Sequence, residues 1–193
     1  MAIILAIESF DRFVMQPPSM PEMSAQAALQ LVKLFDEQHI AVILDGGWGV
    51  DALLGEQTRR HADLDIVIAY DDVIRLRSLL EGKGYADVPR PDTRPVNFVM
   101  GDAQGHEVDI HTYSKDRLNH PEQGLDYPLE SFYGEGRILD YPVRCIDAIS
   151  MVQFHTGYEL DDNDYRDVKA LCLRFGIQMP AEYNRFEQPQ PDE

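Results

Sequence analysis

Residues 45–66 read DGGWGVDALLGEQTRRHADLDI, a glycine pair followed by two aspartates, Asp63 and Asp65. The aspartates alternate with Leu64 and Ile66, which predicts a strand whose two carboxylates share one face while Leu64 faces the core. Like charges this close repel each other, and partial burial increases the repulsion. The pair therefore either shares a proton or holds a cation. Carboxylate oxygens suit Mg²⁺, which usually takes one or two protein carboxylates together with water and phosphate oxygens.

A third carboxylate, Asp109, lies in the sequence EVDIH with the same apolar flanks, 44 residues after Asp65. A strand here can pair beside the first. Asp109 would then bind a second ion or accept the proton of an attacking hydroxyl. His111 shares its face because it is two residues further on. The alternatives are polar positions on a solvated sheet face or a structural calcium site. The glycine turn before the repeated pattern favours the catalytic interpretation.

Gly46 and Gly47 join a predicted buried strand, residues 40–44, to a short helix that ends at Gly55. Glycine allows close approach of the backbone, and the free N–H groups at a helix start attract phosphate. Most glycine pairs are only turns, but this one comes one strand before the paired carboxylates. Together the two features predict a cradle for a triphosphate beside a metal site.

The residues around this turn supply further candidates. Arg59 and His61 lie in the loop that leads to Asp63, where they can contact phosphates, although solvation of the loop is an equal alternative for both. Trp48 either stacks on a base or anchors the packing. In the C-terminal stretch FHTGYELDDNDYRDVKAL, Lys169 can reach a triphosphate and Tyr158 can stack on a base or an acceptor. The alternative there is a surface helix with ordinary ion pairs.

The composition bounds the class of protein. The chain has 193 residues, 44% of them hydrophobic, which suits one domain or a core with a small helical addition. Its net charge of −17 repels phosphate backbones, so we expect no nucleic-acid partner; the charge favours a cationic ligand, or serves solubility alone. Cys145 and Cys172 form neither a disulfide framework nor a zinc-ligand spacing, which is typical of a reducing compartment.

The N-terminal sequence MAIILAIESFDRFV lacks a basic n-region and a cleavage site and is too short to span a bilayer, so we expect a cytoplasmic protein with no membrane partner.

Hydrophobic periodicity and turn signals predict the elements in order. We expect helices at 24–38, 48–55, 71–84, 146–157 and 162–175, and strands at 40–44, 63–70, 96–100 and 106–113, with a long loop at 114–136 and a strand pair or a bent strand at 137–145.

This order indicates an α+β fold, a small mixed sheet covered by helices with a helical C-terminal portion. The predicted divisions are an N-terminal extension at 1–22, a core at 23–145, a C-terminal helical region at 146–180 and a disordered tail at 181–193.

Several motifs together resemble a known family. GGW at 46–48, DALLG at 51–55, HADLD at 61–65 and VD at 108–109 resemble the small antibiotic nucleotidyltransferases of the DNA polymerase β superfamily. The likeness covers residues 25–178 and is greatest to the lincosamide nucleotidyltransferases and the related aminoglycoside 2″-nucleotidyltransferases.

The resemblance implies a polymerase β-type nucleotidyltransferase fold and magnesium-dependent transfer of a nucleoside monophosphate from a triphosphate to a drug hydroxyl. By position, Asp63 and Asp65 match the metal-binding pair, and Asp109 matches the third carboxylate, which can act as general base. Gly46 and Gly47 match the phosphate-binding turn. The family also places a C-terminal helical region beside nucleotide and acceptor, which adds His155 to the candidates and supports Tyr158 and Lys169. His111, on the face of Asp109, is a further candidate for binding the acceptor.

We therefore predict an enzyme that uses Mg²⁺, with two ions expected, to transfer AMP from ATP to a cationic small-molecule antibiotic, a lincosamide in the first place. An aminoglycoside is the nearest alternative. A toxin–antitoxin or regulatory protein acting on a macromolecule would want a basic patch, and a metal-dependent hydrolase would want further histidine ligands. A homodimer remains an open possibility.

Overall fold

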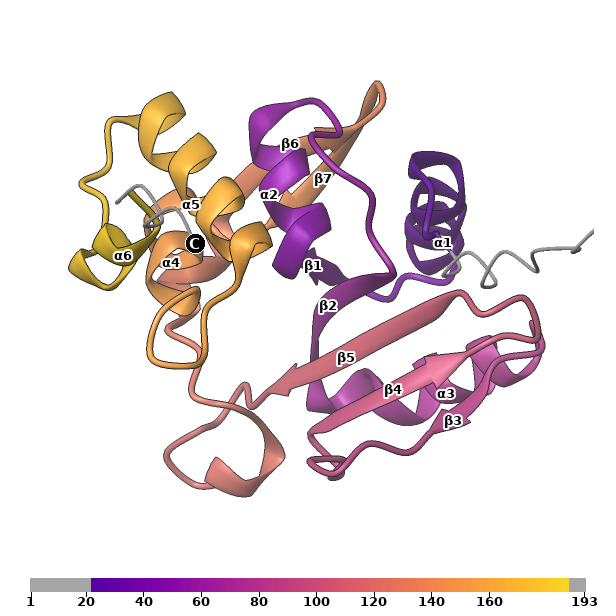
Figure 1. The fold of residues 1–193 in the computed structure, drawn as a ribbon. Coiled ribbons are helices and arrows are strands. Elements are labelled where there is room, and N and C mark those ends of the chain that lie inside the picture. Colours follow the sequence, from indigo (N-terminus) through magenta and orange to yellow (C-terminus); the bar gives the residue numbers. More distant parts are fainter. Residues whose placement is uncertain (1–21, 188–193) are drawn as a thin grey trace, which may run out of the picture.

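The computed structural model describes residues 22–187, in which one mixed sheet of seven strands, in the order β3-β4-β5-β2-β1-β7-β6, forms the centre (Figure 1). Its strands are β1 (Val42–Leu44), β2 (Asp63–Ala69), β3 (Ala86–Val88), β4 (Asn97–Gly101), β5 (Glu107–Tyr113), β6 (Gly134–Ile138) and β7 (Tyr141–Cys145). The pairs β2–β5 and β1–β7 are parallel and the others antiparallel. The predicted mixed sheet is confirmed.

The helices surround this sheet as the sequence predicts, with small shifts of their ends. They are α1 (Ala25–Glu37), α2 (Gly46–Leu54), α3 (Val73–Glu81), α4 (Ala148–Phe154), α5 (Asp162–Phe175) and α6 (Asn184–Glu187), with 3₁₀ turns at Tyr70–Asp72, Pro121–Gln123, Leu129–Tyr133 and Ala181–Tyr183. Ser24 caps α1 by accepting a hydrogen bond of 3.2 Å from the Ala27 amide. In Figure 1, α1 and α3 lie on one side of the molecule, and α4, α5 and α6 lie on the other.

Two predicted features are corrected. Residues 137–145 belong to a hairpin of two strands that begins earlier than expected, at Gly134, and the short strand β3 was not foreseen because its residues are mostly exposed. The predicted disordered tail is wrong for its first residues: Ala181–Tyr183 and Asn184–Glu187 are helical, and the side chain of Tyr183 is completely buried. The Tyr183 hydroxyl donates a 2.6 Å hydrogen bond to the His155 carbonyl, which fixes this segment on α4.

The core consists of two clusters, and the alternation of the strands decides which residue enters which cluster. Leu64, Ile66 and Ile68 of β2 pack with α1 and α3, whereas Val67 packs with α4 and α5. On β5, Val108 and Ile110 join the first cluster. Since side chains two residues apart share a face, the aspartates between these residues face the side of α4 and α5.

Parts of the predictions fall outside the described residues. The expected N-terminal extension does so except for Glu22, which forms a 2.9 Å ion pair with Arg60, and so do residues 188–193 of the expected tail. Within residues 22–187, no helix has both the length and the apolar character needed to cross a membrane. Cys145 and Cys172 are both buried as free thiols.

Candidate active site

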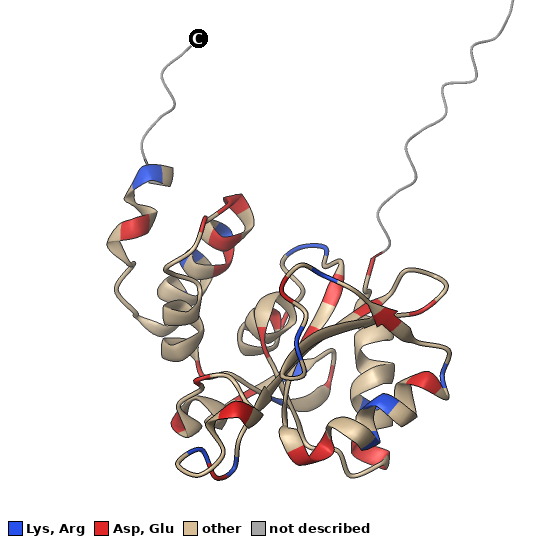
Figure 2. Ribbon diagram, turned by 90° about the horizontal axis from the view of Figure 1, so that it is seen from below, with Lys and Arg blue, Asp and Glu red and all other residues tan. Residues whose placement is uncertain are grey.

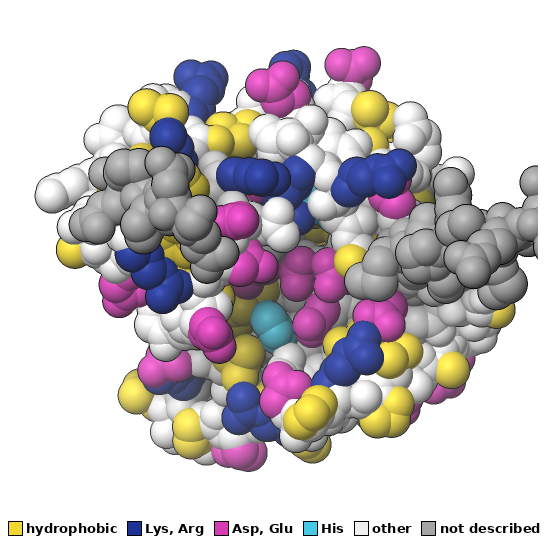
Figure 3. Space-filling model, viewed as in Figure 1, with side chains coloured by type: hydrophobic (Ala, Val, Ile, Leu, Met, Phe, Trp, Pro, Cys, Tyr) yellow, Lys and Arg dark blue, Asp and Glu magenta, His cyan; other side chains and the backbone are white. Residues whose placement is uncertain are grey.

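The register of β2 against β5 brings the three predicted carboxylates onto one face of the sheet. Asp65 lies directly beside Asp109, and Asp63 precedes Asp65 by two residues on the same strand. His111 follows on this face next to Val67. Figure 3 shows the result at the surface, where acidic side chains and a histidine gather in a central hollow bordered by lysines and arginines. The predicted juxtaposition of Asp63, Asp65 and Asp109 is therefore present.

This proximity makes ionisation of the three carboxylates costly. Burial raises the pKa of Asp63 and of Asp109, and the neighbouring carboxylates Glu107 and Asp63, respectively, raise them further. The pKa of Asp65 is raised well above its usual value, first by burial and then by Asp63, Asp109 and Asp45. A cation placed here would reverse that effect.

The donor set fits such a cation. The Oδ1 atom of Asp109 is buried and accepts no hydrogen bond, and the nearest ring nitrogen, Nε2 of His111, is 3.6 Å away. Residues 22–187 contain no group of three or more Asp, Glu, His or Cys side chains already closed around a metal position. An open set of carboxylates is nevertheless what Mg²⁺ takes, because it keeps several water or phosphate oxygens as ligands.

Helix α2 begins directly against these carboxylates. Asp45 is its N-cap and accepts a 2.9 Å hydrogen bond from the Gly46 amide, and the Asp45 amide donates to the carbonyl of Asp65 at 3.0 Å. Gly46 has a φ of +52°, and a methyl group on it would lie 2.3 Å from Oδ2 of Asp65. Only glycine allows this approach. The glycine pair thus forms the first turn of the helix rather than a break before it.

Gly47 lies against the two basic side chains that the loop supplies. A methyl group here would lie 2.4 Å from Nδ1 of His61 and 2.6 Å from Nη2 of Arg59. The guanidinium of Arg59 forms a forked ion pair with Asp167 of α5, with contacts of 2.7 and 3.1 Å. Its charge also lowers the pKa of Asp65 against the larger effect of burial. The structure therefore brings Arg59 and His61 to the glycine turn.

His61 is buried and its orientation is set by Asp51, whose Oδ2 lies 2.5 Å from Nε2. An ionised carboxylate only accepts, so Nε2 carries the proton, and Nδ1 on the glycine side donates only when the ring is protonated. Trp48 is buried with its ring centroid 4.7 Å from that of His61. Of the two roles considered for Trp48, the packing anchor is the one observed.

A cavity of about 370 Å³ opens in front of Asp65 and the start of α2. Its lining comprises Asp45, Gly46, Asp65, His111, Leu125, Asp126, Tyr127, Phe154 and His155. The hydroxyl of Tyr127 donates to Oδ2 of Asp45 at 2.9 Å and lies 3.0 Å from Nδ1 of His111. His155 ends α4 and is held by a 2.8 Å contact from Nδ1 to the Met151 carbonyl. The predicted His111 and His155 therefore line the same cavity.

A smaller cavity of about 210 Å³ has Asp63 and Asp109 in its wall. Its rim is polar and includes the ion pair of Arg90 and Glu107, whose contact is 2.6 Å. Asp65 thus lines one cavity and Asp63 and Asp109 line a second, which suits a reaction that joins two substrates.

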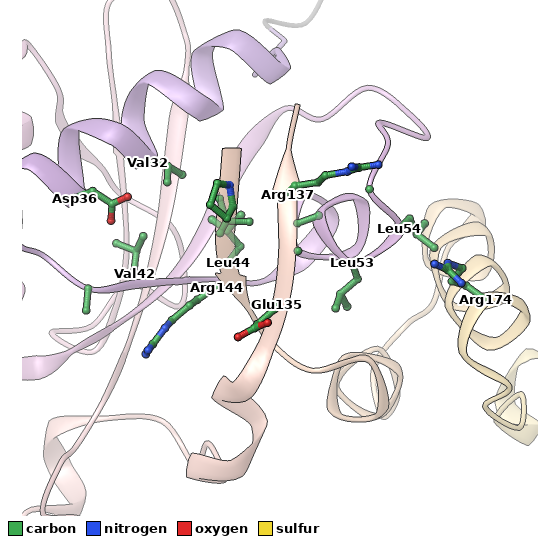
Figure 4. Close-up of a pocket in the computed structure, with 16 residues that line it drawn as sticks. Val32, Asp36, Val42, Leu44, Leu53, Leu54, Glu135, Arg137, Arg144 and Arg174 are labelled. Atoms are coloured by element: carbon green, nitrogen blue, oxygen red, sulfur yellow. The ribbon is translucent and has the colours of Figure 1, made fainter. Parts of the chain in front are cut away.

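A larger cavity, about 650 Å³, is elsewhere (Figure 4). It lies at the C-terminal end of α2, between Leu53, Val42 of β1 and the β6–β7 hairpin, with Arg137, Arg144 and Arg174 at its edge. None of the predicted site residues lines it. Its volume alone therefore does not make it the reaction site.

For two predicted residues, Tyr158 and Lys169, the observed contacts are with other side chains than Asp63, Asp65 and Asp109. Tyr158 precedes α5 and is half exposed, and its hydroxyl donates a 2.8 Å hydrogen bond to Asp164. The ammonium of Lys169 lies 3.1 Å from the Tyr165 hydroxyl on its own helix. Their assignment to acceptor and nucleotide stays a prediction, as do the roles of the other candidates.

Four residues with prominent contacts were missed as candidates: Asp45, Asp51, Tyr127 and Asp167. Asp45 could have been found, because an aspartate before a glycine pair is a strong helix-cap signal. Asp51 and Asp167 stand inside recognised motifs. Asp51 pairs with Thr58 and His61 of the loop that follows its helix, whereas Asp167 is 108 residues from its partner Arg59. Tyr127 lies in the long loop, where no periodicity of the sequence indicates the direction in which a side chain points.

Known proteins match most of the chain. Residues 27–171 match the family described as aminoglycoside-2''-adenylyltransferase. A lincosamide resistance protein of Staphylococcus haemolyticus is 30% identical over 149 residues, which cover 73% of this chain and 89% of that protein.

Two solved structures are also similar. The lincomycin-bound lincosamide antibiotic adenylyltransferase LnuA has a TM-score of 0.68 at 26% identity, covering 81% of this chain and 99% of its own. ANT(2")-Ia in complex with adenylyl-2"-tobramycin has a TM-score of 0.62 at 18% identity and covers 84% and 92%, which shows a shared fold.

Proposed function

The chain belongs to the aminoglycoside-2''-adenylyltransferase family of antibiotic nucleotidyltransferases, and on that basis we propose that it transfers AMP from ATP to a hydroxyl of a lincosamide. The observation that carries this proposal is the register of β2 and β5. It aligns Asp65 with Asp109 beside the first turn of α2. A triphosphate bound at this turn would then lie next to Asp109, the base proposed for the acceptor hydroxyl.

The chain's own residues divide the work. Asp63, Asp65 and Asp109 would hold Mg²⁺, which when bound supplies positive charge to the α-phosphate and to the pyrophosphate that leaves. The amide of Gly47 and the guanidinium of Arg59 bind the β- and γ-phosphates, and Gly46, whose amide donates to Asp45, lets the phosphates approach the backbone because it has no side chain. Catalysis then consists mainly of positioning and charge stabilisation.

Asp109 acts as the general base. The acceptor hydroxyl gives its proton to this carboxylate. The hydroxyl oxygen of the acceptor then forms a bond to the α-phosphorus, and the bond from that phosphorus to the bridging oxygen of pyrophosphate breaks. The buried, unpartnered Oδ1 of Asp109 supports the role, because a carboxylate oxygen without a donor is ready to accept a proton.

The lining of the 370 Å³ cavity, which adjoins Asp109 through its wall residues Asp65 and His111, supports a lincosamide as acceptor. Leu125, Tyr127 and Phe154 offer apolar surface, while Asp45 and Asp126 offer negative charge. A molecule with one amine and an apolar body suits this combination better than a polycation without apolar surface. The net charge of −17 attracts either class and does not separate them.

The test is a panel of acceptors. Purified protein, Mg²⁺ and each nucleoside triphosphate are incubated with lincomycin, clindamycin and several aminoglycosides, and mass spectrometry detects an added nucleoside monophosphate. We expect AMP on the lincosamides. Addition to aminoglycosides alone would contradict the acceptor, and a preference for another triphosphate would contradict ATP.

The Asp109→Asn variant tests the base. We expect it to bind ATP with an affinity close to that of the wild type and to lose at least about a hundredfold in turnover. Calorimetric titration gives the affinity, and single-turnover kinetics give the rate. A rate near that of the wild type would mean that another group removes the proton.

A further inference from the structure

The buried ion pair between Arg59 and Asp167 links α5 to the glycine turn. Asp167 is 2% exposed, although carboxylates are rarely buried to this extent. It accepts from Nε of Arg59 at 3.1 Å and from Nη2 at 2.7 Å, a geometry that fixes the plane of the guanidinium. The Arg59 side chain is 23% exposed, so solvent reaches the arginine of the pair but hardly the aspartate.

A count of donors shows what remains available on Arg59. A guanidinium has five N–H groups. Nε and one N–H of Nη2 point to Asp167, and Nη1 donates to the Arg60 carbonyl at 3.1 Å. Among the contacts of residues 22–187, this leaves one N–H on each terminal nitrogen, and Nη2 is the atom that a methyl group on Gly47 would approach.

We propose that Asp167 is a positioning residue for the nucleotide, which holds the Arg59 fork so that its two remaining N–H groups face the phosphates at the start of α2. This inference rests on the proposed function and adds to it a link between the C-terminal helix α5 and the triphosphate. Without Asp167 the guanidinium would be free to rotate, and ordering it would weaken binding.

A competing idea gives the opposite sign. If Asp167 only neutralised Arg59, removing its charge would release the guanidinium and strengthen the binding of a phosphate. The direction of the change in affinity therefore decides between positioning and neutralisation.

The experiment uses the full chain and two probes, ATP with Mg²⁺ and inorganic triphosphate. Isothermal titration measures both affinities for the wild type, Asp167→Asn and Asp167→Glu. We expect Asp167→Asn to bind each probe about tenfold more weakly, with an increased KM for ATP but nearly unchanged kcat at saturation. Asp167→Glu, which keeps the carboxylate, should recover affinity to within about threefold.

Two controls keep the test decisive. Asp102→Asn makes the same chemical change in the turn between β4 and β5, where Asp102 contacts His106, and it should lower stability without weakening either probe. If Asp167→Asn does not fold, Arg59→Lys replaces it, since lysine keeps the charge but lacks the fork, and we expect the same tenfold loss.

Unchanged or tighter binding in the folded variant would overturn the proposal. A wild type that binds triphosphate but transfers nothing to any acceptor would instead contradict the proposed function and leave the role of Asp167 standing.

Discussion

Two groups of carboxylates, one on the β2–β5 face and one around α2, differ in how they are paired. Asp51 and Asp167 are each only 2% exposed, yet both accept several hydrogen bonds. Asp65 is partly exposed, but among residues 22–187 no group donates a hydrogen bond to its side chain, and the charges of Asp63 and Asp109 raise its pKa. The most deeply buried carboxylates are thus the paired ones, and the β2–β5 face differs from them in lacking a hydrogen-bond donor to Asp65.

The comparison extends to the whole surface. Figure 2 shows Asp and Glu spread over many parts of the ribbon, interspersed with Lys and Arg. Acidic residues as such are too widespread to mark a site. The β2–β5 face differs because its carboxylates repel one another in a partly buried position, a cost that a bound cation would offset.

The strongest test of this difference is Asp65→Asn. We expect turnover to fall at least about a thousandfold, because the charge that would hold Mg²⁺ is lost. We also expect the metal-free variant to melt a few degrees higher than the wild type, since a repulsive charge is removed. Kinetics and thermal unfolding with EDTA or with Mg²⁺ measure both effects.

Adding Mg²⁺ should raise the melting temperature of the wild type but not that of Asp65→Asn. The matched control is Glu135→Gln, an exposed charge change at the larger cavity, which should alter neither quantity. An Asp65→Asn variant that keeps more than a tenth of the turnover would show that this face is not the metal site.

Asp51→Asn should have the opposite effect on stability. Asp51 accepts from the amide and the hydroxyl of Thr58, at 3.1 and 2.6 Å, and from His61. An amide in its place leaves buried groups unpaired, so we expect a loss of about 2–4 kcal/mol in the free energy of unfolding. Urea unfolding measures it. A variant as stable as the wild type would mean that these paired carboxylates do not hold the fold.

Tyr127→Phe tests an intermediate case, because it removes one of the two hydrogen bonds that the Asp45 carboxylate accepts. Asp45 would lose the 2.9 Å hydrogen bond from the tyrosine and keep the one from Gly46. We expect a loss of about 1–1.5 kcal/mol in the free energy of unfolding. Tyr133→Phe, at a tyrosine that is 79% exposed, is the control and should be neutral. Equal stability of both variants would show that Asp45 gains nothing from Tyr127.

These contrasts also explain how much the sequence could predict. Alternation on β2 and β5 placed Asp63, Asp65 and Asp109 on one face, because strand geometry is local and the pairing of β2 with β5 was plausible from their spacing. The glycine pair was found, although its place inside α2 depended on Asp45 as a cap.

The partners of the paired group could not be predicted in the same way. Arg59 and Asp167 meet only because α5 packs on α2, and hydrophobic periodicity in the sequence does not indicate which helices pack together. Tyr158, Asp167 and Lys169 lie in one C-terminal stretch, and the contact of Asp167 with Arg59 beside Gly47 is known from the structure and not from the sequence. Local chemistry was predictable, and the packing of distant helices was not.

The smallest expected effect concerns Asp102, a paired carboxylate near the surface. Burial alone would raise its pKa, but the His106 side chain and the amides of His106 and Gln104 hydrogen-bond to it and hold the pKa below its usual value. A depressed pKa means that the carboxylate contributes stability above its unfolded value of about 3.9, and that this contribution is lost as the pH falls through the folded value.

Asp102→Asn should therefore cost about 0.5–1 kcal/mol at pH 7, because solvent screens the turn, and almost nothing near pH 2. Urea unfolding of both proteins at the two pH values measures the difference. The sign is the reverse of that expected for Asp65, whose raised pKa makes its ionisation work against folding as the pH rises. A difference that persisted at pH 2 would show that Asp102 stabilises the turn by its shape rather than by its charge.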